Sequence, residues 1–209
     1  MPLYSNMSDA GTLKAIVSSK AKVMSCLDLG SWDGGDAIQM KQAFPEAVVT
    51  AVEGSPLRIE IVRENCNPNG IRVVQAVVTG DGGKPLVMEH SSIGDEPHCG
   101  TIKGFKDGAP FPKGWHKINS IDVVSTGIME LLDDVGDVDL LHMDVEGAEY
   151  DILNKLLPTP KKPLLISMEV CGAMWFNNCG NRGELLELLN KHGYSVLHDG
   201  VTDMVFVLG

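Results

Sequence analysis

The chain has 209 residues, of which 44% are hydrophobic and 22% are charged, and its formal net charge is −11. This length fits one globular domain with a sizeable core. The negative charge argues against nucleic acid as a partner, because neutralising phosphates requires clustered Lys and Arg. The sequence shows neither an apolar run of about 18 residues nor a signal-peptide pattern, so we expect a cytoplasmic protein with no membrane association.

The five cysteines are odd in number and form no CxxC pair. A disulfide framework or a zinc site is therefore not expected, and reduced thiols are the simpler interpretation. Nothing in the composition indicates an oligomeric state.

The first 78 residues alternate between helix and strand patterns. The predicted elements are a helix over 9–20, a strand over 22–29, a helix over 36–44, a strand over 47–52, a helix over 56–67 and a strand over 71–78. This alternation favours a parallel sheet with helices on both of its faces.

The alternation stops at Thr79. Residues 79–116 are rich in Gly, Pro and His and contain only short strand-like pieces. A long stretch without periodicity is typical of a functional loop. We therefore expect one domain, residues 1–209, in which this loop excursion shapes a substrate site.

Regular patterns return after residue 116. The predicted elements are a strand over 117–124, a helix over 127–132, a strand over 138–143, a helix over 148–157, a strand over 163–170, a helix over 183–192 and a terminal hairpin over 194–198 and 204–208.

A glycine-rich turn follows the first predicted strand. Glycines allow positive φ and close approach of a ligand, and the free amides at the turn and at the helix start are hydrogen-bond donors. This geometry is typical of a site that cradles a nucleotide. The candidate binding residues in this stretch are Asp28, Gly30, Ser31, Trp32, Asp33 and Gly34.

A second acidic position follows the next strand. Glu53 lies 53 − 34 = 19 residues after Gly34, close to the distance of about 20 at which an acidic residue binds ribose hydroxyls. Ligands of open α/β sheets bind beyond the carboxyl ends of the strands, which adds Gly54 and Ser55 as candidates. Together these residues indicate a ligand that contains adenosine.

Trp32 helps to decide which adenosine compound fits. A dinucleotide fingerprint requires glycine at this position, where the backbone approaches the pyrophosphate. A nicotinamide dehydrogenase is therefore a weaker alternative. S-adenosylmethionine has no pyrophosphate, and its positive sulfonium suits an acidic rim, here formed by Asp28, Asp33, Glu53, Asp144 and Glu146.

Three segments resemble FkbM-type S-adenosylmethionine-dependent methyltransferases: residues 28–34, 52–56 and 140–149, the last reading LLHMDVEGAE. The resemblance extends over about residues 22–208 and implies the Rossmann-like class I methyltransferase fold. That fold is α/β, with a seven-stranded, mostly parallel sheet, a C-terminal antiparallel strand and helices on both faces. The resemblance also implies O-methylation, commonly of a hydroxyl group of a sugar or small molecule.

The resemblance further implies roles for individual residues. Residues 30–34 are expected to hold the methionine moiety, Glu53 the ribose, and Ala76 with Val77 to border the adenine. The sequence departs from the family pattern at two places. Trp32 stands where the family usually has a small polar residue, and residues 126–128 replace the usual Thr-Leu-Asp.

Three carboxylates are the catalytic candidates: Asp144, Glu146 and Glu169. Each closes or follows a predicted strand, where it can orient donor and acceptor or take up the hydroxyl proton. Acidic residues just before a helix also stabilise its N-terminus, so a purely structural role stays open.

Two further alternatives also remain open. Asp144 and Glu169 end neighbouring strands and can bind Mg²⁺, as in a divalent-metal-dependent O-methyltransferase. No third ligand is evident, so we assign no metal site. A non-catalytic module that binds S-adenosylmethionine and assists an active enzyme is the other alternative.

Aromatic residues and one histidine complete the candidates. Trp115, Trp175 and Phe176 can wall the acceptor site, although core packing explains them equally well. His142 lies two residues before Asp144, and we expect it to be a buried structural histidine.

Overall fold

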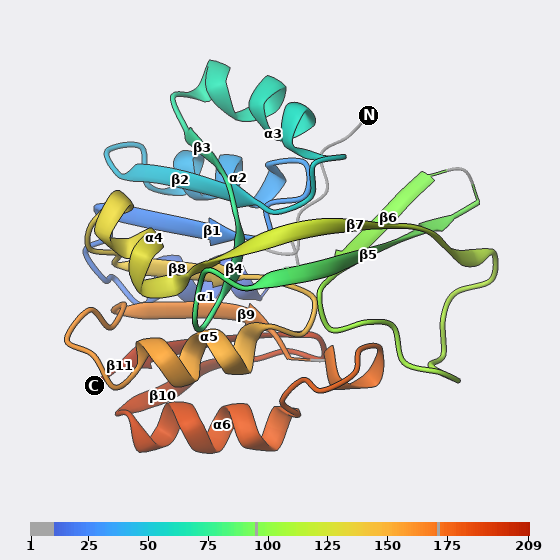
Figure 1. Cartoon of the computed structure of the whole chain (residues 1–209). Coiled ribbons are helices and arrows are strands. Elements are labelled where there is room, and N and C mark those ends of the chain that lie inside the picture. Colours follow the sequence, from blue (N-terminus) through green and yellow to red (C-terminus); the bar gives the residue numbers. More distant parts are fainter. Residues whose placement is uncertain (1–10, 95, 171) are drawn as a thin grey trace.

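A seven-stranded sheet forms the centre of the computed structural model, which describes residues 11–94, 96–170 and 172–209 (Figure 1). Its strand order is β3-β2-β1-β8-β9-β11-β10. The strands are β1 Ser25–Leu29, β2 Val48–Glu53, β3 Arg72–Gln75, β8 Leu140–Met143, β9 Leu165–Glu169, β10 Tyr194–Asp199 and β11 Asp203–Leu208. Neighbours from β3 to β9 are parallel, whereas β11 is antiparallel to β9 and β10. The expected sheet is confirmed.

Helices cover both faces of this sheet. One face carries α1 Thr12–Ser18, α2 Gly35–Ala43 and α3 Ile59–Cys66, and the other carries α4 Ile128–Val135, α5 Glu149–Leu156 and α6 Arg182–Lys191. Single 3-10 turns, η1 Asn67–Asn69 and η2 Gly172–Met174, complete the helical elements that the structure describes. The helix expected over residues 9–20 is confirmed for residues 12–18, which form α1. Residues 9 and 10 lie outside the described residues.

The central strands have continuous apolar sequences because they are buried on both faces. Cys26 belongs to the core on the α1–α3 face, and Leu27 belongs to the core on the α4–α6 face. Successive side chains of a strand point to opposite faces, so a strand covered on both sides buries every residue. Residues 26–29 of β1 are accordingly all buried.

Residues 85–93 and 96–101 form long strands of a second sheet, so the expectation of a loop was wrong for this part of 79–116, while residues 102–114 form no named strand. The strands of this sheet are β4 Val77–Thr79, β5 Pro85–Ile93, β6 Glu96–Thr101 and β7 Trp115–Gly127, in the order β4-β7-β5-β6. The side chains of His90, Ser91 and Ser92 are polar yet buried. They interrupt the alternation of apolar and polar residues by which a strand is recognised.

The second sheet also changes the assignment of two predicted strands. The strand expected over 71–78 is divided between β3 in the first sheet and β4 in the second, and the strand expected over 117–124 lies within β7. Strands β5, β6 and β7 extend past the carboxyl edge of the seven-stranded sheet (Figure 1). They therefore stand beside the edge at which ligands of α/β sheets bind.

Among the described residues, no helix is both long and apolar enough to cross a bilayer.

Candidate active site

A cavity of about 400 Å³ lies at the carboxyl ends of the parallel strands. The strand order reverses there, between β1 and β8, as the general rule for ligand sites in α/β sheets requires. Most of the residues predicted from the sequence line it, namely Gly30, Ser31, Trp32, Glu53, Gly54, Ser55, Ala76, Val77, Asp144, Glu146 and Glu169.

Gly30 allows the loops after β1 and β8 to touch. Its φ is +84°, and an added Cβ would lie 1.8 Å from the carbonyl oxygen of Asp144. The backbone N–H of Asp144 donates to the carbonyl of Leu29 at 2.9 Å. Only glycine permits this approach, which places the glycine turn and Asp144 on one cavity wall.

Trp32 is held at the cavity wall in a conformation that is unusual for a bulky residue. Its φ is +56°, in the left-handed region that disfavours side chains with a Cβ. The N–H of Trp32 donates to Glu53 Oε2 at 2.8 Å, and Arg58 Nε donates to the carbonyl of Trp32 at 3.3 Å. The Arg58 guanidinium also lies 3.8 Å from the centre of the indole, a cation–π contact. These contacts fix the indole.

Glu53 organises the loops on the same side of the cavity. Its Oε1 accepts the N–H of Ser55 at 2.6 Å, while Oε2 holds Trp32. Burial raises the pKa of Glu53, although the N–H donors and Arg58 oppose that shift. Each carboxylate oxygen accepts more than one hydrogen bond, so contact with ribose hydroxyls remains compatible with these bonds.

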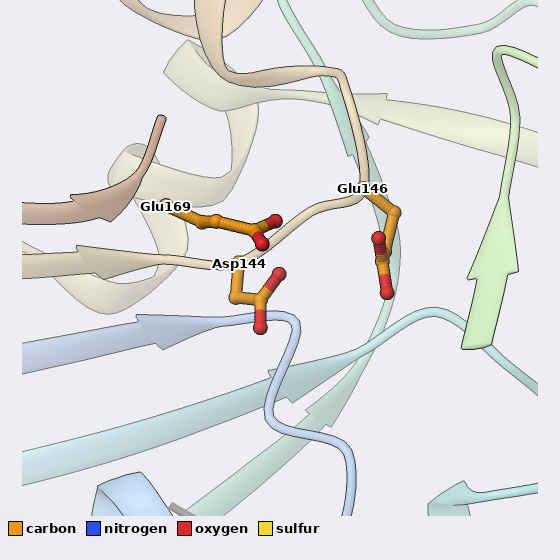
Figure 2. Close-up of side chains that lie close together, drawn as sticks. All are labelled: Asp144, Glu146 and Glu169. Carbon is orange, nitrogen blue, oxygen red and sulfur yellow. The ribbon is translucent and has the colours of Figure 1, made fainter. Parts of the chain in front are cut away.

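Asp144, Glu146 and Glu169 converge within the same cavity. One side-chain oxygen from each lies within 4.8 Å of the others. Figure 2 shows Asp144 and Glu169 at the ends of adjacent strands, with Glu146 reaching in from the loop after β8. Glu146 has φ +53°, and its carbonyl accepts the Thr101 hydroxyl at 2.7 Å. The left-handed turn brings Glu146 beside Asp144 and Glu169, the two carboxylates that the sequence indicated as possible Mg²⁺ ligands.

The cluster has perturbed acidity. Burial, followed by the charges of Glu169 and Glu146, raises the pKa of Asp144 well above its ordinary value. Burial and the charges of Glu169 and Glu149 do the same for Glu146. Carboxylates packed together cannot all ionise easily. The cluster is therefore suited to hold a proton or a cation at neutral pH.

Three predicted cofactor residues shape the glycine turn from behind the cavity wall. Asp28 is 1% exposed and accepts the Ser31 hydroxyl at 2.6 Å. Asp33 Oδ1 accepts the N–H of Gly35 at 3.0 Å, and Gly34, with φ +88°, precedes α2. None of the three is among the residues that line the cavity in the described structure.

His142 is buried, as the sequence indicated, and it lies within a charged network. Its Nδ1 is 3.2 Å from Ser167 Oγ and its Nε2 is 3.5 Å from Asp36 Oδ2. Burial lowers the pKa of His142, but the carboxylates of Asp36, Asp28 and Asp203 outweigh this effect and raise the pKa to about 9. The imidazolium therefore compensates carboxylates beneath the glycine turn.

Aromatic rings form a third part of the cavity. Phe111, Trp115, Trp175 and Phe176 line it, and we call these four residues the aromatic wall. Phe111 and Trp115 stack at 3.7 Å with 6° between their planes, while Phe105 packs edge-on against Trp115 at 5.0 Å. Sequence reasoning missed Phe111. The available signal was the concentration of aromatic residues near positions 105–115 and 175–176.

Other lining residues were also missed. Six come from the second sheet or the segment that follows β6: Val78, Met88, Cys99, Gly100, Ile102 and Pro112. The other four lie in α2, in β2 and in the loop after β8: Asp36, Val52, Val145 and Ala148. The apolar members of this group carry no chemical signature, so only their position in the fold reveals them.

Residues 28–196 match the model of the methyltransferase FkbM domain family. The chain belongs to this family. The FkbM domain is also similar to "Methyltransferase 1" of Beauveria bassiana (strain ARSEF 2860), with 25% identity over 142 residues, which are 62% of this chain and 57% of the relative. The aligned region thus spans little more than half the length of that curated relative.

Solved structures show the same fold. The cofactor-bound Rv0187 from MTB has a TM-score of 0.56 and 12% identity, covering 100% of the FkbM-domain chain and 83% of its own. A proposed O-methyltransferase from Klebsiella pneumoniae has a TM-score of 0.55 and 13% identity, covering 100% and 84%. The class I methyltransferase fold expected from the sequence is confirmed.

Proposed function

We propose that this FkbM-domain protein transfers a methyl group from S-adenosylmethionine to a hydroxyl oxygen of a small-molecule acceptor. One observation carries the proposal: a single cavity is lined by the glycine turn and Glu53, which we call the donor side, and by a cluster of three carboxylates. The donor side has the features of an adenosine site, and the carboxylate cluster has the features of a proton acceptor.

The residues on the donor side fit S-adenosylmethionine. Gly30 allows the turn after β1 to pack directly against the backbone of Asp144, and Glu53 holds the same turn through the N–H of Trp32. The family resemblance assigns residues 30–34 to the methionine moiety, Glu53 to the ribose, and Ala76 with Val77 to the adenine. The carboxylates that face the cavity favour a cationic donor.

The chemistry then follows from the carboxylate cluster. Bound S-adenosylmethionine supplies a methyl carbon attached to a positively charged sulfur. The acceptor oxygen bonds to this carbon as the carbon–sulfur bond breaks, and that bond's electron pair stays on sulfur. The hydroxyl proton passes to Asp144, Glu146 or Glu169. Raised pKa values make such carboxylates better proton acceptors near neutral pH.

Calorimetry of the purified protein with S-adenosylmethionine tests the donor, and the absence of binding would exclude the proposal. The catalytic role is tested with Asp144→Asn and Glu146→Gln. We expect at least one of them to lower kcat about a hundredfold or more, because a general base contributes that much. Cofactor binding without turnover on any acceptor would instead favour a non-catalytic module.

A second candidate is divalent-metal-dependent O-methylation. Glu146 favours it, because this residue supplies the third carboxylate within 4.8 Å of the other two. Carboxylate oxygens are preferred ligands of Mg²⁺, and a bound cation lowers the pKa of a coordinated hydroxyl. If this candidate holds, EDTA treatment abolishes turnover and added Mg²⁺ restores it. Full activity after EDTA, with no heat of Mg²⁺ binding, contradicts it.

A further inference from the structure

We propose that the acceptor is a phenol: a neutral, flat aromatic ring that carries the reacting hydroxyl. The proposal rests on the proposed O-methyl transfer and names the acceptor class for the same site. Three features of the cavity carry it, namely the aromatic wall, the shortage of other polar side chains, and the position of the carboxylate cluster.

The aromatic wall presents ring surface to the cavity. Phe176 is 4% exposed, and Phe105, which packs against the wall without lining the cavity, is 9% exposed. Phe111, Trp115 and Trp175 are only half-buried, although each packs against another ring. Apolar ring surface left in contact with water is unfavourable. A flat aromatic ligand covers such surface in offset-stacked or edge-to-face contacts that add about 0.5–1.5 kcal/mol beyond area burial.

The rest of the acceptor side offers few hydrogen-bonding groups. Apart from donor-side residues, the polar side chains that line the described cavity are the carboxylate cluster, the two indoles and Cys99. A sugar carries several hydroxyls, each of which must find donors and acceptors when it is buried. Amide side chains, which commonly supply both, are absent from the described lining. One hydroxyl on an apolar ring needs only one partner.

Anionic acceptors are disfavoured for a separate reason. No Lys or Arg is among the described residues that line the cavity. Nearby Lys103 binds Asp151, and Lys106 donates to the carbonyl of Ala173 at 3.3 Å. The carboxylate cluster would repel a phosphate or carboxylate on the substrate. The acceptor should therefore be neutral.

The carboxylate cluster lies where it can accept the proton of a phenol. Asp144, Glu146 and Glu169 line the same cavity as the aromatic wall, and one side-chain oxygen from each lies within 4.8 Å of the others. A phenolic hydroxyl, as in tyrosine, has a pKa of about 10, so it releases its proton more readily than a sugar hydroxyl. The phenol oxygen gains the methyl group and its proton passes to the carboxylate.

Direct binding and turnover test the inference with two neutral probes, 2-naphthol and methyl β-glucoside. Binding of each probe is measured by calorimetry on protein saturated with S-adenosylhomocysteine, and turnover is measured by methyl transfer from labelled S-adenosylmethionine. We expect 2-naphthol to bind and to be methylated, and methyl β-glucoside to do neither. Methylation of the glucoside but not of 2-naphthol overturns the inference and leaves O-methyl transfer intact.

Variants locate the binding site. Trp175→Leu and Phe111→Leu remove a ring and keep an apolar side chain, and each should weaken 2-naphthol binding about fivefold to tenfold. The matched control is Met174→Leu, at a neighbouring residue that is 53% exposed and does not line the cavity. Retained affinity for S-adenosylhomocysteine shows that each variant is folded.

The outcomes separate the two proposals. If S-adenosylhomocysteine binds but 2-naphthol neither binds nor reacts, the acceptor class is wrong and the donor assignment stands. Unchanged naphthol affinity in both ring variants also overturns the inference. If the wild-type protein does not bind S-adenosylhomocysteine, the proposed function fails and the acceptor class fails with it.

Discussion

Glu149 is the first residue of α5, and its carboxylate supports the loop that carries the catalytic candidates. Its Oε1 accepts the N–H groups of Val145 at 3.1 Å and of Gly147 at 3.4 Å. The residue is 5% exposed. Burial raises the pKa of Glu149 to about 7, although these hydrogen bonds oppose the shift.

This raised pKa predicts a pH-dependent stability. The folded state holds the Glu149 proton more tightly than the unfolded state, whose glutamate pKa is about 4.3. The stability that protonated Glu149 contributes is therefore lost as pH rises from about 4.3 through about 7. Glu149→Gln lacks this loss, so its free energy of unfolding should rise relative to that of the wild type by roughly 2–3 kcal/mol between pH 4 and pH 8. Urea unfolding at both pH values measures the difference, and parallel curves would contradict the assignment.

Glu53 gives a second prediction for a single residue. In Glu53→Gln, an NH₂ group replaces one of the two oxygens that accept the N–H groups of Trp32 and Ser55. Two donors then face each other, so affinity for S-adenosylmethionine should fall about tenfold or more. Calorimetry measures this affinity, with Glu60→Gln, at an exposed position of α3, as the control. Equal affinities in the two variants would count against a donor-site role for Glu53.

At the scale of elements, the end of β6 holds the turn after β8. Thr101 is 1% exposed; its hydroxyl donates to the carbonyl of Glu146 at 2.7 Å and accepts the N–H of Lys103 at 3.0 Å. Thr101→Val keeps the volume but removes both bonds. We expect kcat to fall about tenfold while affinity for S-adenosylmethionine stays constant, because one buried hydrogen bond is worth about 1–3 kcal/mol.

A conservative variant separates positioning from simple destabilisation. Thr101→Ser retains the hydroxyl and should restore most of kcat, although it also loses a buried methyl group. If Thr101→Ser is as slow as Thr101→Val, the hydroxyl is not what positions Glu146.

The predicted elements were most reliable where helices and strands alternate. The elements of the seven-stranded sheet follow from apolar periodicity, because parallel strands covered on both faces are almost wholly apolar. The second sheet did not follow from periodicity. Its β5 buries His90 and Ser91, and contacts with distant segments, such as the 2.8 Å contact of His90 with Ser55, accommodate these polar groups.

At the scale of the whole molecule, the cavity lies between the two sheets, so a ligand there should stabilise both. S-adenosylhomocysteine at about 100 times its Kd should add about 2.7 kcal/mol of stability. For a domain of this size, that corresponds to a rise in Tm of roughly 5–10 °C. Differential scanning calorimetry measures this shift.

Hydrogen exchange shows where the stabilisation acts. We expect slower exchange in the loops after β1, β2 and β8 and also in β5, since Ser55 and His90 join the two sheets. Protection confined to the seven-stranded sheet would show that the second sheet does not respond to the donor.

The sequence by itself determined the class of fold and indicated much of the proposed donor side. The glycine turn and Glu53 lie at ends of neighbouring strands, so chain order and strand periodicity already bring them together. Tertiary structure decided the acceptor side. Glu146 joins Asp144 and Glu169 only through a left-handed turn anchored by Thr101, and the aromatic wall is assembled from segments about 60 residues apart. Local periodicity cannot specify such contacts, because they depend on how distant backbones pack.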